Sequence, residues 1–403
     1  MPPSPISRLD SRPSPFRPMI VAGVMSGTSA DGIDVALVEI RPIRNGLKLK
    51  LLGHRAFPFA PVLRKAILSA MDAKSTSTAE LARLNWRLGQ AYAEAVRATV
   101  KRYPVRLQLI GCHGQTIYHQ ATPSMYAGRK VACTWQIGEP ALLAAELDVP
   151  VVNNFRPADM VAGGQGAPLV PLLDYVEFAH EKRTRILQNI GGIGNLTLIP
   201  PASGTDKLLA FDTGPGNMVI DALMQQLFRK PYDRGGKIAV RGRVLESALA
   251  AALRYPFFHA KPPKSAGREE FGAAFAEQLL RACRKAGGTS EDVITTATAL
   301  TAESIVHAFE HFVRPRLKHG IAVDYIVSGG GAKNKTLMAM LRQKLEPFGC
   351  NVMESVDAGI PVDAKEAVAF ALLAYYTWHR RPANLPSATG ARRAAILGQI
   401  TYA

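Results

Sequence analysis

The sequence is poor in cysteine and in aromatic residues, and it contains no long apolar run. Its four cysteines among 403 residues, Cys112, Cys133, Cys283 and Cys350, are scattered, without the paired spacing of a zinc site or a redox motif. This usage indicates free thiols in a reducing compartment and excludes a disulfide scaffold. No stretch is apolar for long enough to cross a bilayer, and no apolar block with a cleavage site follows the N-terminal arginines. We therefore expect a cytoplasmic protein that neither spans nor binds a membrane.

Negative charge is also scarce. The chain has 49 Lys and Arg residues against 32 Asp and Glu residues, a net charge of +17. Basic proteins often bind nucleic acid by neutralising phosphates. Here the basic residues are spread in short clusters along the chain, and the aromatic residues (7%) do not interleave with them as stacking platforms would. The composition therefore predicts no nucleic-acid partner and a basic surface that favours small anionic molecules.

The order of apolar runs predicts two similar α/β halves after a short tail. Residues 1–18 are rich in Pro, Ser and Arg and have too little apolar surface to fold, so we expect them to be disordered. Each half opens with a strand, a Gly-rich turn and a second strand, and helices then alternate with further strands, which is typical of α/β architecture. Among these later elements, the sequence predicts a short buried strand at 107–112, an irregular loop at 157–166 and a helix at 218–228. We place the first domain at 19–182 and the second at 183–403.

Three Gly-rich turns follow apolar strands, at residues 26–32, 212–217 and 328–334. Glycine lets the backbone approach a ligand closely, and successive exposed N–H groups form an anion-binding concavity. One such turn alone is more often a plain tight turn, but three in one chain, two of them rich in hydroxyls, favour a nucleotide. None has the spacing of a P-loop or of a dinucleotide fingerprint.

Together these turns resemble the phosphate and adenosine turns of the actin-like ATPase superfamily. Ten segments, in order between residues 19 and 376, narrow the resemblance; among them are MSGTSADGID (25–34), GCHGQTIYH (111–119), FDTGPGNMVID (211–221) and IPVDAKEAVAFA (360–371). They are similar to the anhydro-N-acetylmuramic acid kinase family. The resemblance implies an α/β, two-domain actin-like (ribonuclease H-like) fold with ATP in the interdomain cleft and Mg²⁺ as a second cofactor. It also implies a reaction of cell-wall recycling that opens 1,6-anhydro-N-acetylmuramic acid with water and phosphorylates its 6-oxygen.

The same resemblance assigns the site residues. Asp212 is the expected general base, with Glu366 as a second active-site carboxylate, and Asp34 and Asp212 are the expected metal ligands. The expected sugar-binding residues are His113, Gln115, Glu139, Arg156 and Asp159. The expected nucleotide-binding residues are Gly27, Thr28, Ser29, Ala30, Asp31, Gly32, Ile33, Asp34, Asn189, Gly191, Gly192, Thr213, Gly214, Gly216, Asn217, Gly329, Gly330, Gly331 and Asn334.

Structural alternatives accompany these assignments. Asp212 is expected to end a strand and open a turn, where an Asp can simply cap the turn. Glu366 is expected in the first turn of a helix, where it can act on the helix dipole alone. Ala30 faces either the core or the nucleotide. At the level of function, another sugar or acyl kinase on the same fold and a non-kinase actin-like ATPase stay open, as does a homodimer.

Overall fold

The computed structural model describes residues 17–43, 46–71, 73, 75–354 and 361–403. Its contacts divide the chain into two compact units. Unit 1 comprises Met1–Glu177 and Asp363–Ala403, and unit 2 comprises Phe178–Val362. The expected second domain at 183–403 differs from this division, because the C-terminal residues pack with unit 1. The predicted tail at 1–18 lies almost wholly outside the described residues.

Unit 1 is built on a mixed sheet, whose strands are β1 (Met19–Ser26), β2 (Gly32–Ile43), β3 (Gly46–Pro58), β4 (Leu109–Tyr126), β5 (Arg129–Ile137), β6 (Val151–Asn153) and β12 (Gln399–Thr401). Within the described residues their order is β12-β6-β4-β1-β2-β3, and β5 pairs with β4. The first three strands form an antiparallel meander, whereas β4 runs parallel to β1 and β6 parallel to β4. Sequence reasoning ended the fourth strand at Cys112, but β4 continues to Tyr126 because it forms a long hairpin with β5.

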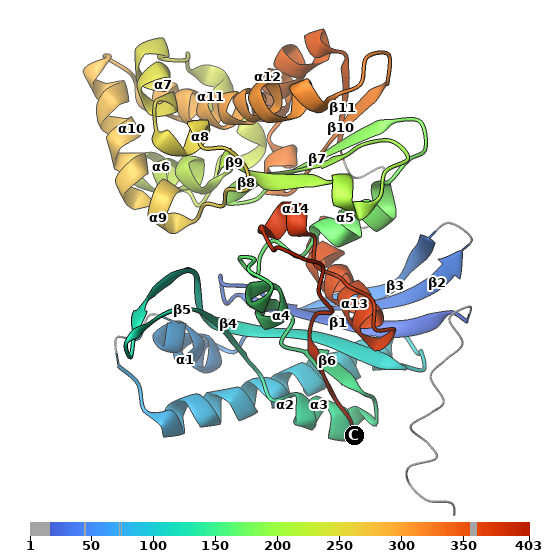
Figure 1. The fold of residues 1–403 in the computed structure, drawn as a ribbon. Helices are drawn as coiled ribbons and strands as arrows, with labels where there is room; N and C mark the ends of the chain where they lie inside the picture. The colour runs from blue at the N-terminus through green and yellow to red at the C-terminus, as the bar shows by residue number, and fades with distance from the viewer. Residues whose placement is uncertain (1–16, 44–45, 72, 74, 355–360) are drawn as a thin grey trace, which may run out of the picture. The chain divides into compact units, whose positions relative to one another are not determined.

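Helices cover both faces of this sheet (Figure 1). The helices of unit 1 are α1 (Pro61–Met71), α2 (Thr78–Arg102), α3 (Pro140–Leu147), α4 (Arg156–Val161), α5 (Pro171–Phe178), α13 (Lys365–Trp378) and α14 (Pro386–Thr389). Helix α2 begins where the Ser77 side chain accepts a hydrogen bond from the N–H of Glu80, at 3.1 Å. Its apolar side packs against alternate residues of β1, including Ala22 and Val24, in one core. Helix α4 occupies part of 157–166, where the sequence predicted an irregular loop.

Helix α13 packs on the opposite side of β1 and β4, on glycines. Gly23 and Gly111 are register partners on these two strands. A Cβ atom on Gly23 would lie 1.8 Å from the carbonyl oxygen of Ala367, and one on Gly111 would lie 2.2 Å from that of Phe370. The helix backbone therefore rests directly on the strands, and no larger residue fits at either position.

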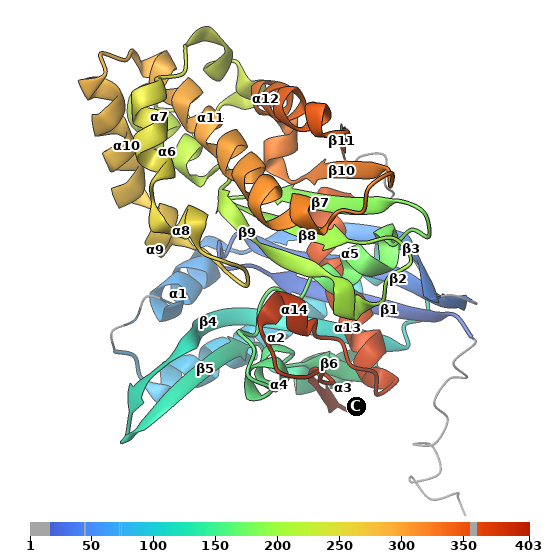
Figure 2. The same ribbon diagram turned by 45° about the horizontal axis from the view of Figure 1, so that its top comes forward.

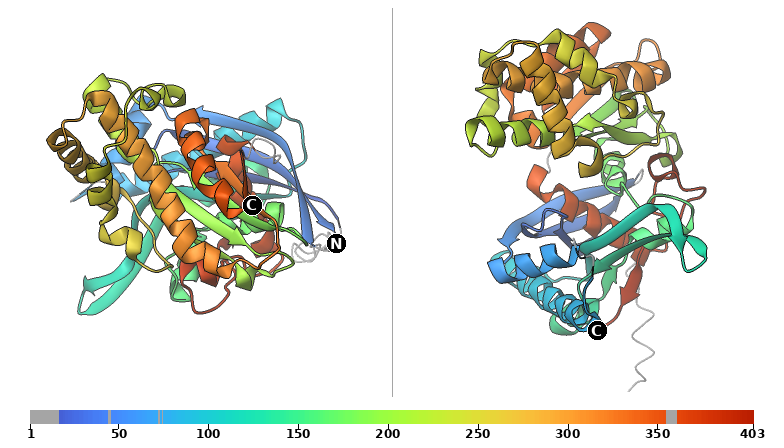
Figure 3. Two further views of the ribbon diagram at one scale, coloured as in Figure 1. Left: turned by 90° about the horizontal axis from the view of Figure 1, so that it is seen from above. Right: turned by 90° about the vertical axis from the view of Figure 1, so that its left-hand side faces the viewer.

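Unit 2 repeats the same design on a second sheet. Its strands are β7 (Thr184–Ile190), β8 (Ile193–Ile199), β9 (Leu209–Pro215), β10 (Val323–Ser328) and β11 (Cys350–Glu354). Its helices are α6 (Met218–Phe228), α7 (Glu246–Leu253), α8 (Pro256–His259), α9 (Arg268–Phe271), α10 (Ala273–Lys285), α11 (Ser290–Ala308) and α12 (Lys335–Leu345). Figures 2 and 3 show the long helix α11 crossing the sheet. The helix predicted at Met218–Phe228 is confirmed residue for residue.

The two sheets share one topology. Within the described residues unit 2 has the order β11-β10-β7-β8-β9, with an antiparallel meander of three strands and two strands parallel to the first. Unit 1 has the same sequence of pairings in β6-β4-β1-β2-β3. This repetition confirms the predicted duplication and the actin-like, ribonuclease H-like α/β fold. In the described part of the chain, no helix has both the length and the apolar character to cross a membrane.

Candidate functional site

In unit 2, two Gly-rich turns interlock through backbone hydrogen bonds. The N–H of Gly216 donates to the carbonyl of Gly192 at 2.9 Å, and the N–H of Asn217 donates to that of Gly191 at 2.8 Å. A Cβ on Gly216 would lie 2.2 Å from the carbonyl oxygen of Gly191. The β7–β8 turn and the turn between β9 and α6 therefore form one rigid element.

The third turn joins this element at Ile190. A Cβ on Gly331 would lie 2.3 Å from Cγ2 of Ile190, and one on Gly329, whose φ is +86°, would lie 2.6 Å from the Ile190 carbonyl oxygen. Asn217 donates from Nδ2 to the same carbonyl at 3.3 Å. Three segments far apart in the sequence thus meet at one point, as three turns around one nucleotide would.

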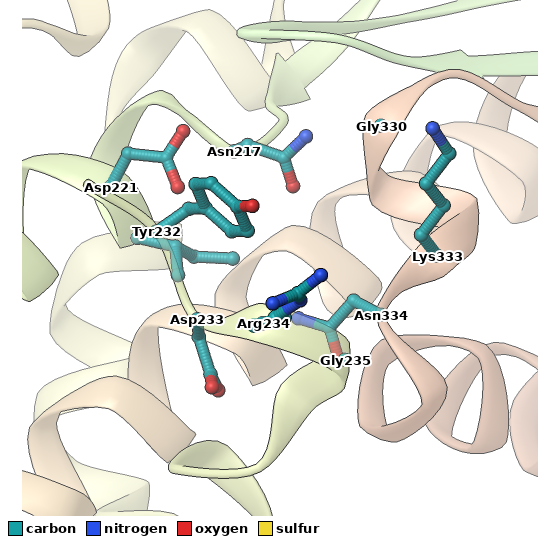
Figure 4. A pocket seen from close by; sticks show the side chains of 10 residues that line it. Asn217, Asp221, Tyr232, Asp233, Arg234, Gly235, Gly330, Lys333 and Asn334 are labelled. Carbon is teal, nitrogen blue, oxygen red and sulfur yellow. The ribbon is translucent and has the colours of Figure 1, made fainter. Parts of the chain in front are cut away.

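Beside these turns, unit 2 has a cavity of about 600 Å³ (Figure 4). Ten residues line it: Asn217, Ile220, Asp221, Tyr232, Asp233, Arg234, Gly235, Gly330, Lys333 and Asn334. Figure 4 shows Asp221 and Tyr232 on one side and Lys333 on the other. Burial raises the pKa of the Asp221 carboxyl to about 6. A cavity of this size and mixed polarity accommodates a nucleoside.

The cavity includes three expected nucleotide-binding residues, Asn217, Gly330 and Asn334, and seven that sequence reasoning did not assign. The segment YDRGG at 232–236 is one of the ten segments that carry the family resemblance, which assigns it no role. Its Asp233 accepts hydrogen bonds from the N–H groups of Ile238 and Ala239, both at 2.9 Å. The Asp233 carboxylate thereby orders this part of the cavity wall. The sequence alone gave no sign that 232–235 line the cavity; the fold shows it by bringing them beside Gly330.

Asp212 lies within β9, three residues before the end of that strand, rather than at the opening of a turn. The pairing of β8 with β9 shifts register here, so that Asn195 faces Asp212 while Gly194 faces Gly214. The extra residue, Thr213, forms a β-bulge, a feature that re-aims neighbouring side chains. The alternative that Asp212 only caps its turn does not describe this position, because its side chain accepts a hydrogen bond from a distant segment.

That distant segment is 264–266. The N–H of Ala266 donates to Oδ2 of Asp212 at 2.8 Å, and the N–H of Asp212 donates to the carbonyl of Lys264 at 3.0 Å. Burial raises the pKa of Asp212 to about 6, against the lowering effect of the Ala266 hydrogen bond and of the Lys264 ammonium. A carboxylate with this pKa is ionised at neutral pH and is basic enough to accept a proton.

In unit 1, the first Gly-rich turn presents its hydroxyls to solvent and buries its alanine. Thr28 and Ser29 are exposed, whereas Ala30, with a φ of +52°, is fully buried in the core. The Ala30 methyl group therefore faces the core, which decides between the two alternatives. Asp31 pairs instead with Arg64 at 3.2 Å.

Also in unit 1, Glu366 lies among charged groups. Desolvation raises the pKa of Glu366, the guanidinium of Arg156 lowers it, and the carboxylate of Asp34 raises it. Asp34 on β2 also lies 3.1 Å from Nε2 of His54. Glu366 stands in the first turn of α13, as expected, and Lys365 also lowers its pKa, so three charged neighbours as well as the helix dipole act on it.

His113, which is buried, pairs with the half-buried Arg156. Nδ1 of His113 donates to the carbonyl of Gly114 at 2.7 Å, so Nε2 is free to accept hydrogen bonds from the guanidinium of Arg156. Burial first, and Arg156 second, lower the pKa of His113 to about 3. Arg156 also donates to the carbonyl of Gly166 at 2.7 Å. A neutral imidazole thus orients a cationic side chain.

Gln115 connects the first Gly-rich turn with the β4–β5 hairpin. It is fully buried, and its Nε2 donates to the carbonyl of Gly27 at 3.1 Å. Its Oε1 is buried without a hydrogen-bond partner among the described residues, as is Oε1 of Gln136 on the facing strand β5. A buried acceptor left unpaired is costly, so each oxygen indicates a donor supplied by a ligand or water. Gln136 was not among the expected site residues.

Glu139 and Asp159 are occupied by the protein itself. Glu139 caps α3 through the N–H of Ala141 and accepts from Nδ2 of Asn85, both at 3.1 Å. Asp159, fully buried, accepts from the N–H of Gly166 at 2.8 Å and from the side chains of Asn384 and Thr389, both at 2.7 Å. These contacts engage both carboxylates with the protein, and direct contact of either residue with a sugar stays a prediction.

Comparison with known proteins identifies the family of this chain. Residues 19–403 match the family model described as anhydro-N-acetylmuramic acid kinase. Curated proteins of that name from Bacillus cereus (strain G9842) and Bacillus thuringiensis subsp. konkukian (strain 97-27) are 45% and 44% identical over 387 residues, which cover 95% of this chain and 99% of each relative.

Solved structures with partial likeness include the activator of 2-hydroxyisocaproyl-CoA dehydratase from Clostridium difficile with bound ADPNP, at a TM-score of 0.41 and 11% identity over 90% of this chain and 96% of that one. The ROK hexokinase of Thermus thermophilus gives a TM-score of 0.37 at 13% identity over 90% and 100% of the two chains. The full-length match to the family model and the 45% identity decide the classification. The chain belongs to the anhydro-N-acetylmuramic acid kinase family.

Proposed function

We propose that this protein is an ATP-dependent kinase of cell-wall recycling and amino sugar catabolism. It opens 1,6-anhydro-N-acetylmuramic acid with one water molecule and transfers the γ-phosphoryl group of ATP to the 6-oxygen, which gives N-acetylmuramic acid 6-phosphate and ADP. The observation that carries the proposal is the convergence around Ile190 of three Gly-rich turns of unit 2, at 191–192, 214–217 and 329–331, beside a cavity of about 600 Å³, in a member of this family.

The cavity and the turns suit a bound nucleotide. We assign the adenosine moiety to the cavity lined by Tyr232 and Asp221, because an exposed aromatic ring offers a stacking surface and a carboxylate accepts from ribose or adenine donors. The interlocked turns at 191–192 and 214–217 supply N–H donors for phosphate oxygens. In unit 1, the exposed hydroxyls of Thr28 and Ser29 are assigned as further phosphate donors.

The residues present also suit Mg²⁺. In the described part of the chain no three His, Cys, Asp or Glu side chains gather as a metal cage. Mg²⁺ in kinases needs none, since it binds one or two carboxylates together with waters and phosphates. Asp34 is a partly exposed carboxylate at the first Gly-rich turn, and we assign the ion to it, which leaves Asp212 for proton transfer. When bound, the ion neutralises charge on the phosphates.

Asp212 then acts as the general base. Its Oδ2 is held by the N–H of Ala266, and its other oxygen can take a proton from the water that attacks carbon 1 of the sugar. Glu366 is assigned as the second carboxylate of the site. The 6-oxygen freed by opening of the bridge attacks the γ-phosphorus, and the chain contributes mainly position and fixed dipoles to this step.

The sugar is assigned to unit 1. Its lactyl carboxylate suits the Arg156 guanidinium, which His113 orients, because charged planar groups of this kind pair with carboxylates. The unpaired Oε1 atoms of Gln115 and Gln136 suit sugar hydroxyls.

Two features favour a cytoplasmic location. The proposed phosphoryl donor is ATP, and the cysteines are free thiols: Cys112, Cys133, Cys283 and Cys350. Two copies of the chain can assemble as a homodimer, which sedimentation would test.

Product analysis tests the proposal. Purified protein is incubated with Mg-ATP and 1,6-anhydro-N-acetylmuramic acid, and the product is weighed by mass spectrometry. A gain of one water and one phosphoryl group supports the proposal, and phosphorus NMR locates the phosphate at position 6. Parallel reactions with glucose and N-acetylglucosamine identify another sugar kinase if they are phosphorylated instead. ATP-dependent sedimentation without any phosphorylated sugar would replace the proposal with a filament-forming ATPase.

A further inference from the structure

Lys264 is a buried lysine beside Asp212 that the reaction described above does not use. It lies between α8 and α9 of unit 2 and is 9% exposed. Its Nζ donates to the carbonyl oxygens of Phe257 at 3.0 Å and Phe258 at 3.2 Å. It also lies over the rings of Phe257 and Phe312, at 4.6 Å and 5.1 Å from their centroids. The ammonium is thus held by carbonyl dipoles and aromatic faces.

Burial of an ammonium group in this setting costs free energy. A buried charge loses its hydration, and a well-packed apolar side chain of similar volume is often at least as stable in its place. Methionine would fill this space without that cost. Stability alone therefore does not account for a lysine here.

The position of Lys264 in the chain explains why a lysine stands here. Its own carbonyl accepts the N–H of Asp212, and the residue two further on, Ala266, donates to the Asp212 carboxylate. Residues 264–266 therefore hold Asp212 at its backbone and at its side chain. The Lys264 ammonium fastens this segment to α8, which packs close to β9, since a Cβ on Gly214 would lie 2.7 Å from the ring of Phe258.

We propose that Lys264 is a positioning residue for the reaction: by anchoring residues 264–266 to the Phe257 and Phe258 carbonyls, it fixes the two hydrogen bonds that aim Asp212. This inference rests on the assignment of Asp212 as the base. This role differs from a general stabilising role, because Lys264 acts through the Asp212 carboxylate. Loss of Lys264 should therefore lower kcat only when that carboxylate is present.

A double-mutant cycle separates these roles. Lys264→Met removes the ammonium and keeps the length of the side chain; Lys261→Met, at an exposed lysine three residues earlier, is the matched control. Misplacement of a catalytic group by about 1 Å costs on the order of 10²-fold in rate, so we expect kcat of Lys264→Met to fall about 10- to 100-fold. The KM for sugar and the Kd for ATP should stay within about twofold, and Lys261→Met should match the parent.

The decisive comparison is made in the Asp212→Asn background. There, Lys264→Met should lower the residual kcat by less than about twofold, because the two residues act as one unit. Equal losses in both backgrounds, or a parental kcat for Lys264→Met, would overturn the proposal. If Asp212→Asn alone keeps parental turnover, the base assignment fails instead. Should Lys264→Met not fold, as judged by thermal unfolding, Lys264→Gln enters the same cycle under the same criteria.

Discussion

Arg156 donates two hydrogen bonds to the Nε2 atom of His113, from Nε at 3.1 Å and from Nη2 at 2.9 Å. A single imidazole nitrogen thus holds one edge of the guanidinium, while Nη1 is held by the carbonyl of Gly166. Burial and the adjacent positive charge keep His113 neutral. Under the proposed function, His113 therefore acts on the sugar through Arg156, and we expect the two residues to bind the lactyl carboxylate as one element.

Replacement of Arg156 by methionine should weaken sugar binding selectively. A hydrogen bond to a charged group contributes about 1.5–3 kcal/mol, so Arg156→Met should raise the KM for the sugar about 10- to 100-fold. The Kd for ATP, measured by calorimetry, should stay within about twofold. Arg129→Met, at an exposed arginine of the β4–β5 hairpin, is the control and should leave both values unchanged. An unchanged sugar KM in Arg156→Met would remove this residue from the binding site.

Asp212→Asn should lower turnover and spare ATP binding. Loss of a general base costs about 10²–10⁴ in rate, while asparagine preserves the size of the side chain and the acceptor for the N–H of Ala266. Turnover is followed by ADP release and ATP affinity by calorimetry. The matched control is Asp206→Asn, at an exposed aspartate of the same unit that forms an ion pair with Lys207 at 3.5 Å. Near-parental turnover in Asp212→Asn would move the search for the base to Glu366.

The dependence of kcat on pH should follow the Asp212 carboxyl. Burial raises its pKa from 3.8 to about 6. A general base works only when deprotonated, so kcat should be full well above pH 6 and should fall as the pH drops through about 6. Because ATP itself titrates near this range, the profile of Asp206→Asn is the reference. It should keep the acidic decline, and Asp212→Asn should lack it; a decline of the same midpoint in both variants would assign the titration to another group.

Gly216→Ala should disrupt the interlocked turns, whereas Gly191→Ala should not. The new methyl group at 216 would lie 2.2 Å from the carbonyl oxygen of Gly191, so the turns must separate. At 191 the nearest atom is 3.6 Å away, an ordinary contact. Overpacking costs about 1–3 kcal/mol, and we expect a fall in Tm of several degrees and at least about tenfold weaker ATP binding for Gly216→Ala. Equal Tm values for the two variants would show that the turns yield easily.

Local patterns in the sequence predicted much of this fold. The strand–turn–strand openings at Met19 and Thr184 and the helix Met218–Phe228 follow from apolar periodicity and glycine placement. The convergence of the turns at 191, 216 and 331 could be expected only through the family resemblance, because contacts between such distant segments leave no local signal.

Other features depend on tertiary contacts and escaped prediction. The polar residues from His113 to Tyr126 look like a loop, and pairing with β5 makes them a strand. The Ala30 methyl group is buried because a left-handed turn carries it inward. The cavity residues Tyr232 and Arg234 resemble an ordinary polar turn until the fold brings them beside Gly330.

The seating of α13 on Gly23 and Gly111 has a consequence for protein fragments. Unit 1 is completed only when residues more than 180 positions after its first segment have been synthesised, because α13 belongs to it. A polypeptide that stops at Glu177 would present the bare glycine face of β1 and β4 to water, together with the edge of β6 that β12 covers. Nascent chains must therefore wait for the C-terminus before either the face or the edge is protected, and a prematurely truncated product is a substrate for aggregation or proteolysis.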